Sequence, residues 1–418
     1  MEANVGYFLG KRELTGGLQW IDVQDDSVTV ARVLLTQKLT GEPTRFEVRT
    51  ETRAPFRVSG IFQLPPSRNV GATGPRVSSD AEIVFQLRDY VNKLARADVF
   101  SGTVLLAKDG KVLYSAAFGQ ANKDFGAPNK LDTKFNLGSM NKMFTAVTIA
   151  QLAEQGKLSY DDPLSKFIPD FPSAAAAEKI RIKHLLTHTA GLGSYFNDEF
   201  QKSSRERFRT VDDMMQLAKG DSLAFEPGTK WSYSNTGMLV LGKVIEVVTK
   251  QDYFDYVREH LYKPAGMVNT DAYELDRVNP NLAVGYEKEF DRNGTKHFRN
   301  NIFMHVMRGG PAGGGYSTAE DLLRFAEGLK SGKLVSTKTF ELMTTAKPEV
   351  NSPQYGYGFG VGADGIVGHS GGFPGISSNL DIFKGTGYVA VVLSNYGRGS
   401  EPVVQTIRRL VASRAAVP

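Results

Sequence analysis

The chain has 418 residues, of which 41% are hydrophobic and 23% are charged, so we expect globular material with two domains or one large domain plus an accessory part. Its 50 Lys and Arg residues against 45 Asp and Glu residues give a net charge of +5 with no basic run, which argues against a nucleic-acid partner. The absence of cysteine excludes disulfides, thiolate metal sites and cysteine nucleophiles.

The N-terminal segment MEANVGYFLGKREL lacks the basic stretch and apolar core of a secretory signal. The longest apolar runs, such as residues 238–248, are too short to span a bilayer. We therefore expect a soluble chain without a membrane span. The sequence is compatible with the cytoplasm, or with the periplasm or the exterior if a signal was removed. It does not determine the oligomeric state.

Residues 1–64 are expected to form a β-rich accessory extension, because residues 28–35, 44–51 and 56–64 are rich in Val, Phe, Ile and Thr at alternating positions. Residues 65–76, PPSRNVGATGPR, are dense in Pro and Gly and predict a linker. We assign residues 77–418 to the main domain.

In the main domain, a helix is predicted from Ser79, followed by a hairpin whose turn is Asp109-Gly110. A long helix begins near Ser139, and residues 160–350 are mostly helix and loop. Strands then return before a last helix, and they are predicted in residues 355–365, 365–372, 377–383 and 387–395. This order predicts an α/β fold of the α+β type: an antiparallel sheet built from both ends of the domain, flanked by its N- and C-terminal helices, plus a helical domain.

The stretch VGHSGGFPG, residues 367–375, matches G-x-S-x-G, the nucleophile elbow of α/β-hydrolases. That fold places the catalytic His after the nucleophile in the chain. The last of the six histidines is His369, so none follows Ser370. A triad of that type on Ser370 is therefore excluded.

A second serine, Ser139, forms S-x-x-K with Lys142. Three residues apart on a helix, the two side chains come within reach of a hydrogen bond. A lysine whose pKa falls by about three units through burial is able to take the serine proton and create a nucleophile.

Two further patterns accompany S-x-x-K: Tyr233-Ser234-Asn235, and His369-Ser370-Gly371 near the end. The Y-x-N pattern also occurs at Tyr90, in an amphipathic helix, and at Tyr195, which is a second choice in a loop. His184 and His188 have metal-ligand spacing but no H-E-x-x-H glutamate, so a structural role near the site is expected. The glycine-rich residues 309–318 lack the ending of a phosphate loop and predict a tight loop near the cleft.

From about residue 80 to 415 the chain resembles the serine β-lactamase and penicillin-binding protein superfamily, in the class C-like branch that includes family VIII esterases and D-stereospecific peptidases. The resemblance extends over several segments in the family's order: GSMNKMFTAVTIAQLAEQGKLSYDDPLSKFIPDFP, IRIKHLLTHTAGL, FEPGTKWSYSNTGMLVLGKVIE, LYKPAGM, GGGYSTAEDLLRFA and GHSGG.

The resemblance implies an acyl-enzyme mechanism without cofactor or metal. It implies Ser139 as nucleophile, Lys142 as general base and Tyr233 as a partner in proton transfer. Asn235, His369 and Ser370 would bind the substrate, which is a small ester, amide or β-lactam. The backbone N–H groups of Ser139 and Gly372 would form the oxyanion hole.

One motif departs from the family pattern. β-Lactamases usually have K-T-G where this chain has His369-Ser370-Gly371. A histidine that is neutral at pH 7 attracts a substrate carboxylate less than a lysine does. We therefore expect a carboxylesterase-like hydrolase with promiscuous β-lactam hydrolysis. The alternatives are a D-stereospecific peptidase or D,D-carboxypeptidase, a penicillin-binding protein that acylates and stalls, and an acyltransferase.

Overall fold

The computed structural model describes residues 12, 15–27, 29–41, 43–54, 57–64, 77–291, 295–362 and 364–415. Contacts divide the chain into two compact units. The first comprises Met1–Phe100, Lys288–Arg299 and Gln405–Pro418, and the second comprises Ser101–Glu287 and Asn300–Val404. The expected linker, residues 65–76, lies outside the described residues.

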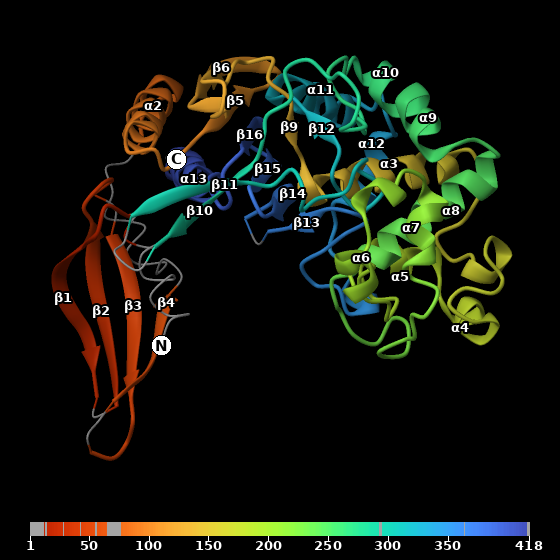
Figure 1. The fold of residues 1–418 in the computed structure, drawn as a ribbon, viewed down its shortest axis with the longest axis horizontal. Coiled ribbons are helices and arrows are strands. Elements are labelled where there is room, and N and C mark those ends of the chain that lie inside the picture. The colour runs from red at the N-terminus through yellow and green to blue at the C-terminus, as the bar shows by residue number, and fades with distance from the viewer. Residues whose placement is uncertain are drawn as a thin grey trace. The chain divides into compact units, whose positions relative to one another are not determined.

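Four antiparallel strands in chain order form the N-terminal sheet (Figure 1): β1 (Leu18–Asp26), β2 (Val30–Gln37), β3 (Pro43–Thr50) and β4 (Val58–Leu64). The three strands predicted in this region are confirmed, and β1 was not predicted. Two register irregularities, Trp20/Asp22 and Val23/Asp25, interrupt the alternation of β1 and obscure its strand pattern.

The helix predicted from Ser79 is confirmed as α2 (Asp80–Arg96), and it belongs to the first unit rather than to the unit that holds most of the expected main domain. The Ser79 side chain caps it by accepting a hydrogen bond from the Glu82 amide. One face of α2 is buried and includes Tyr90. The Y-x-N pattern at Tyr90 is therefore part of a packed helix.

The second unit is built on a six-stranded antiparallel sheet with the order β13-β14-β15-β16-β5-β6. The strands are β13 (Gly360–Val361), β14 (Ile366–Phe373), β15 (Ile376–Phe383), β16 (Tyr388–Ser394), β5 (Gly102–Lys108) and β6 (Lys111–Phe118). Asp109 and Gly110 form the predicted turn between β5 and β6, both with positive φ. Because β16 pairs with β5 along its whole length, the sheet joins segments from opposite ends of the unit, as predicted.

The remaining elements of the chain are helical segments and short strands. The α-helices are α3 (Asn141–Glu154), α4 (Ala174–Lys179), α5 (Ile182–Leu186), α6 (Asp198–Lys202), α7 (Val211–Gln216), α8 (Asn235–Thr249), α9 (Tyr253–Val257), α10 (Lys263–Ala265), α11 (Ala319–Lys330), α12 (Thr337–Met343) and α13 (Glu401–Ala415). Single-turn segments are η1 (Gly138–Met140), η2 (Leu164–Lys166), η3 (Arg205–Arg207), η4 (Arg258–Tyr262) and η5 (Pro348–Val350). The short strands are β7 (Gln120–Asn122), β8 (Ala127–Pro128), β9 (Phe135–Asn136), β10 (Tyr286–Phe290), β11 (Lys296–Asn300) and β12 (Tyr316–Ser317).

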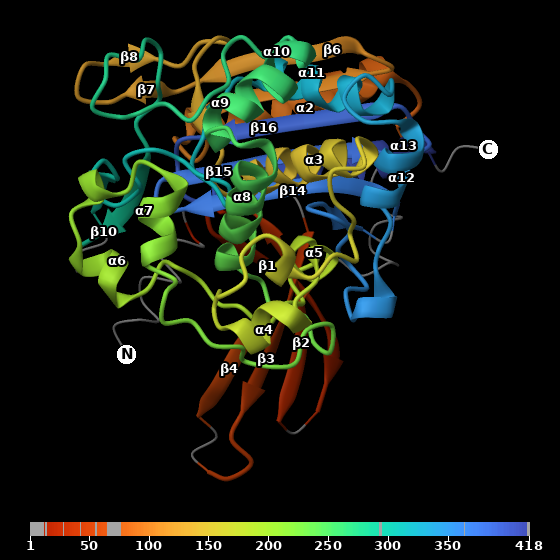
Figure 2. The ribbon, with the colours of Figure 1, turned by 90° about the vertical axis from the view of Figure 1, so that its right-hand side faces the viewer.

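Helix α3 is the helix that positions the site. Its residues are buried nearly all round, which is typical of a helix enclosed by other elements. It contacts α8 and α9, and α8 in turn contacts α5. Helix α11 packs on β16 and β5, and Figure 2 shows α3 in front of β14, β15 and β16 in that view.

None of the helices in the described part of the chain combines the length and apolar character needed to cross a bilayer.

Candidate active site

The segment before α3 is a tight turn held by asparagine side chains and neighbouring backbone. Ser139 is the middle residue of the 3-10 turn η1, which leads directly into α3. Gly138 has φ +49°, and its amide donates to the Asn136 side chain at 2.9 Å. The Leu137 amide donates to the Gly315 carbonyl at 2.7 Å. These bonds fix the Ser139 hydroxyl at a helix start.

The Lys142 ammonium group is fully buried and lies at a meeting point of three segments. Its Nζ lies 3.2 Å from Ser139 Oγ, 2.9 Å from Asn235 Oδ1 and 2.5 Å from the Ala312 carbonyl oxygen. Burial lowers the pKa of Lys142 well below its usual value, so the neutral amine becomes accessible. A neutral amine has two N–H donors and one lone pair. The two amide-type oxygens can only accept, so they take the donors, and the lone pair faces the Ser139 hydroxyl.

Tyr233 lies on the other side of the serine. Its phenol interacts with the Ser139 side chain, and its ring centroid is 4.8 Å from Lys142 Nζ. Burial of the phenol raises the pKa of Tyr233 to about 12, and the interaction with Ser139 opposes this rise. The phenol is therefore protonated at neutral pH and is a hydrogen-bond donor. Tyr233 is 37% exposed, so solvent, and hence a substrate, is able to reach this residue.

Asn235 connects the lysine to a second loop. It is the first residue of α8, whose N-cap Ser234 accepts a hydrogen bond from the Gly237 amide at 2.8 Å. The Asn235 Oδ1 faces Lys142, and its Nδ2 donates to Ser194 Oγ at 3.1 Å. The side chain is thus oriented at both ends.

His369 and Ser370 lie on β14 beyond Gly368, where pairing with β13 ends. His369 Nδ1 lies 2.5 Å from the Ser370 carbonyl, which only accepts, so Nδ1 carries the proton. Nε2 then accepts from the Tyr355 hydroxyl at 2.8 Å. Burial, followed by the charge of Lys142, lowers the pKa of His369 to about 4, so this imidazole is neutral at pH 7.

The Gly372 amide faces the open edge of β14. Phe373 pairs with Ile376 across a two-residue turn, so the next pair, Gly372 with Ser377, is a non-hydrogen-bonded one. The Gly372 N–H consequently points away from β15. A Cβ atom built on Gly138 would lie 3.0 Å from the Gly372 nitrogen, which places this amide against the turn that carries Ser139.

The Beta-lactamase family profile matches residues 87–414. The chain belongs to the Beta-lactamase family. This family comprises serine hydrolases, among them esterases, D-amino acid amidases and penicillin-binding proteins.

Three β-lactamase-family relatives illustrate the similarity. The chain is 32% identical over 294 residues to the putative penicillin-binding protein PbpX of Bacillus subtilis, covering 70% of each chain. It resembles the solved penicillin-binding protein of Bacillus halodurans at 28% identity and TM-score 0.69, over 77% of this chain and 99% of that one. A D-stereospecific amidohydrolase from Streptomyces sp. is 28% identical with TM-score 0.61, over 74% of this chain and 94% of that one.

The structure of this β-lactamase-family chain brings most of the expected site residues together. Ser139, Lys142, Tyr233 and Asn235 are in direct contact, and η1 packs on β14, which carries His369, Ser370 and Gly372.

The second Y-x-N pattern serves another purpose. Tyr195 is buried, and Asn197 caps α6 by accepting a hydrogen bond from the Phe200 amide at 3.0 Å. The glycine-rich loop lies at the site as expected, because it supplies the Ala312 carbonyl.

Several contributors were missed from sequence. The Ala312 carbonyl is a backbone group, which no residue type signals. Ser194 and Tyr355 contact the site through single hydrogen bonds from distant loops. For His184 and His188 a structural role near the site was predicted, and the His188 ring contacts that of Tyr233. The described residues contain no group of three or more His, Asp or Glu placed for a metal.

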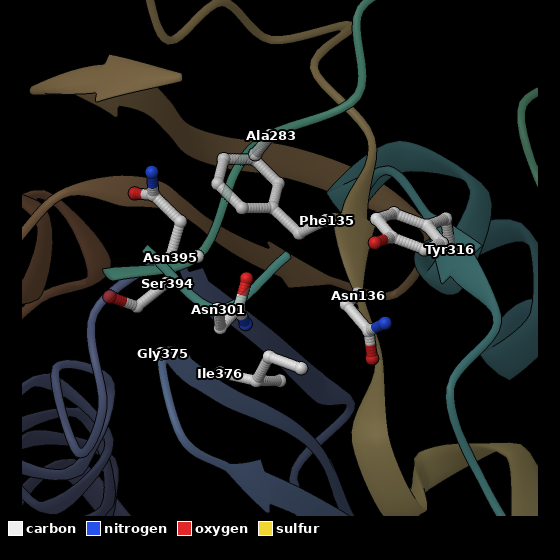
Figure 3. Close-up of a pocket in the computed structure, with 10 residues that line it drawn as sticks. Phe135, Asn136, Ala283, Asn301, Tyr316, Gly375, Ile376, Ser394 and Asn395 are labelled. Atoms are coloured by element: carbon white, nitrogen blue, oxygen red, sulfur yellow. The ribbon is translucent and has the colours of Figure 1, made fainter. Parts of the chain in front are cut away.

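A small cavity of about 10 Å³ lies behind this region (Figure 3). Asn136, which holds the Gly138 amide, lines it together with Asn301 and Asn395. That volume is about the space of one water molecule. This cavity is therefore too small to hold the acyl group of a substrate.

Proposed function

We propose that this protein hydrolyses small carboxylic esters through a covalent acyl-enzyme on Ser139. The observation that carries the proposal is the environment of Lys142. Two carbonyl-type acceptors occupy its N–H groups, its burial favours the neutral amine, and the remaining lone pair faces Ser139 Oγ. That arrangement is the one a lysine general base requires.

In the first half-reaction, Ser139 Oγ attacks the carbonyl carbon of the ester while Lys142 Nζ takes the hydroxyl proton. Negative charge develops on the former carbonyl oxygen. The amides of Ser139 and Gly372 are the donors proposed to stabilise it. The bond to the leaving alkoxide breaks, the alkoxide takes the Tyr233 proton, and the Lys142 proton restores the phenol.

In the second half-reaction, water attacks the acyl carbon. Lys142 Nζ takes the water proton, Ser139 Oγ leaves with the Tyr233 proton, and the Lys142 proton restores the phenol. The raised pKa of Tyr233 suits this role, because the phenol is a donor throughout the neutral range.

The substrate class is argued from His369. An imidazole that is neutral at pH 7 presents no fixed positive charge to a substrate carboxylate. Substrates without a free carboxylate are therefore favoured over β-lactams and C-terminal peptides. Asn235 Nδ2 and the Ser370 hydroxyl are proposed to bind the acyl side of the substrate.

A second candidate is hydrolysis of D-amino acid amides. It is supported by the 28% identity to the Streptomyces D-stereospecific amidohydrolase over 74% of this chain. The similarity to penicillin-binding proteins keeps a slow acylating role and a transfer to other acceptors as further alternatives.

The test measures kcat/KM for p-nitrophenyl butyrate, a D-alanine p-nitroanilide and a chromogenic cephalosporin, with mass spectrometry of the acylated peptide. We expect the ester to dominate, and Ser139→Ala to abolish both turnover and acylation. Ser370→Ala serves as the matched serine variant and should still acylate at Ser139. Acylation that survives in Ser139→Ala would overturn the proposal, and a dominant anilide would select the second candidate.

A further inference from the structure

His188 lies just after α5 and holds both backbone neighbours of Tyr233. The Ser232 amide donates to the His188 carbonyl at 2.9 Å, and the Ser234 amide donates to His188 Nδ1 at 3.1 Å. One residue thus accepts from the amide on each side of the phenol. The backbone of Tyr233 is fixed at two points by a single partner.

The His188 ring also contacts the phenol itself. Its centroid lies 4.5 Å from that of Tyr233, with 40° between the planes. On the same imidazole, the Tyr355 ring lies at 4.7 Å and 52°. Tyr355 in turn donates to His369. The imidazole therefore packs against both tyrosines whose hydroxyl groups face the site.

His188 occupies this place at a local cost. Its φ is +61°, a left-handed conformation that favours glycine or asparagine. Its Nε2 is buried and has no hydrogen-bond partner among the described residues. A residue selected for packing alone would avoid both penalties, and such strain is typical of functional positions.

We propose that His188 is a positioning residue that orients the Tyr233 hydroxyl between Ser139 and the leaving group. The inference rests on the proposed function, because it gives Tyr233 its proton-transfer role. His188 acts as a neutral ring: Nδ1 accepts from Ser234, so the single proton is on Nε2. Burial, the largest cause, lowers the pKa of His188 well below its usual value and favours this neutral form.

The test compares two esters that differ in leaving group. p-Nitrophenolate leaves without a proton, whereas ethoxide needs one from Tyr233. In His188→Ala we expect kcat/KM, which reports acylation, to fall at least tenfold more for the ethyl ester than for the p-nitrophenyl ester of the same acid. Tyr233→Phe should give the same pattern, and the double variant should be no worse than Tyr233→Phe alone.

His188→Asn is the rescue variant, because asparagine tolerates positive φ and its side-chain oxygen can accept from the Ser234 amide. We expect it to recover most of the ethyl-ester kcat/KM. His305→Asn, another buried histidine, is the matched control. Equal losses for both esters in His188→Ala and in His188→Asn, or additivity with Tyr233→Phe, would overturn the inference. Failure of the proposed function is distinguished by acylation in Ser139→Ala.

Discussion

Gly371→Ala tests how closely β14 must approach the turn that carries Ser139. A Cβ atom built on Gly371 would lie 1.9 Å from the Leu137 carbonyl oxygen and 2.4 Å from Ser378 Oγ. Real Cβ atoms essentially never come within 3.0 Å of such atoms, so one backbone segment has to move by about 1 Å or more. The same overlap disrupts the 2.7 Å bond that Ser378 donates to Leu137.

The movement separates the Gly372 amide from Ser139. Loss of one oxyanion donor, or a displacement of 1 Å, costs about 100-fold in rate, so kcat/KM for p-nitrophenyl butyrate should fall by about that factor. Overpacking should also lower the free energy of unfolding by about 1–3 kcal/mol.

Gly360→Ala on the neighbouring strand β13 is the matched control. Its Cβ would meet the nearest described atom, the Gly368 carbonyl oxygen, at 3.5 Å, which is ordinary contact. Steady-state kinetics and urea unfolding measure both effects. If Gly371→Ala keeps more than a third of the wild-type kcat/KM, the close approach is not required and the reasoning is refuted.

Three other predictions follow from burial and exposure. Because Lys142 must be neutral to act, kcat/KM should fall as pH drops through the lowered pKa of Lys142 and should stay level up to about pH 10. If the loss of activity at low pH disappears in His369→Gln, the titrating group is not Lys142. Burial lowers the pKa of His184 to about 4, so as pH falls the unfolded state binds its proton before the folded state does. The contribution of neutral His184 to the free energy of unfolding is complete above about pH 6.5 and is lost as pH falls toward 4, with about 2 kcal/mol lost at pH 5. In urea unfolding, His184→Gln should therefore lose less stability than wild type between pH 7 and pH 5. Trp231 is 46% exposed, and its ring centroid lies 6.4 Å from that of Tyr233. Trp231→Ala should therefore lower kcat/KM for a phenylacetate ester about tenfold more than for an acetate ester. Equal losses for the two esters would show that Trp231 does not bind the acyl group.

The six-stranded sheet and helix α2 were largely predictable from the sequence because their signals are local. The Asp109-Gly110 turn, the Ser79 cap and the apolar strands each depend on neighbouring residues. Strand β1 was not predicted, because its irregular register and acidic residues break the two-residue alternation.

The candidate site was predictable where chemistry requires particular side chains at short spacing. Ser139 with Lys142, and Tyr233 with Asn235, are such pairs. The contacts of the Ala312 carbonyl, Ser194 and Tyr355 depend on how distant loops meet, and nothing local to those residues signals it. The low pKa of Lys142 likewise arises from tertiary burial and not from its neighbours in sequence.

The pairing of β5 with β16 has a consequence for biosynthesis. β5 is apolar and buried along nearly its whole length, yet the strand that covers its second edge is made only after residues 109–387. Until the ribosome has added β16, a growing chain exposes one unpaired hydrophobic edge, the kind of surface on which chains aggregate. Folding of the second unit is therefore expected to be slow, because it is limited by the pairing of strands that are far apart in the sequence. Ribosome-bound chains that stop before β16 should depend on chaperones.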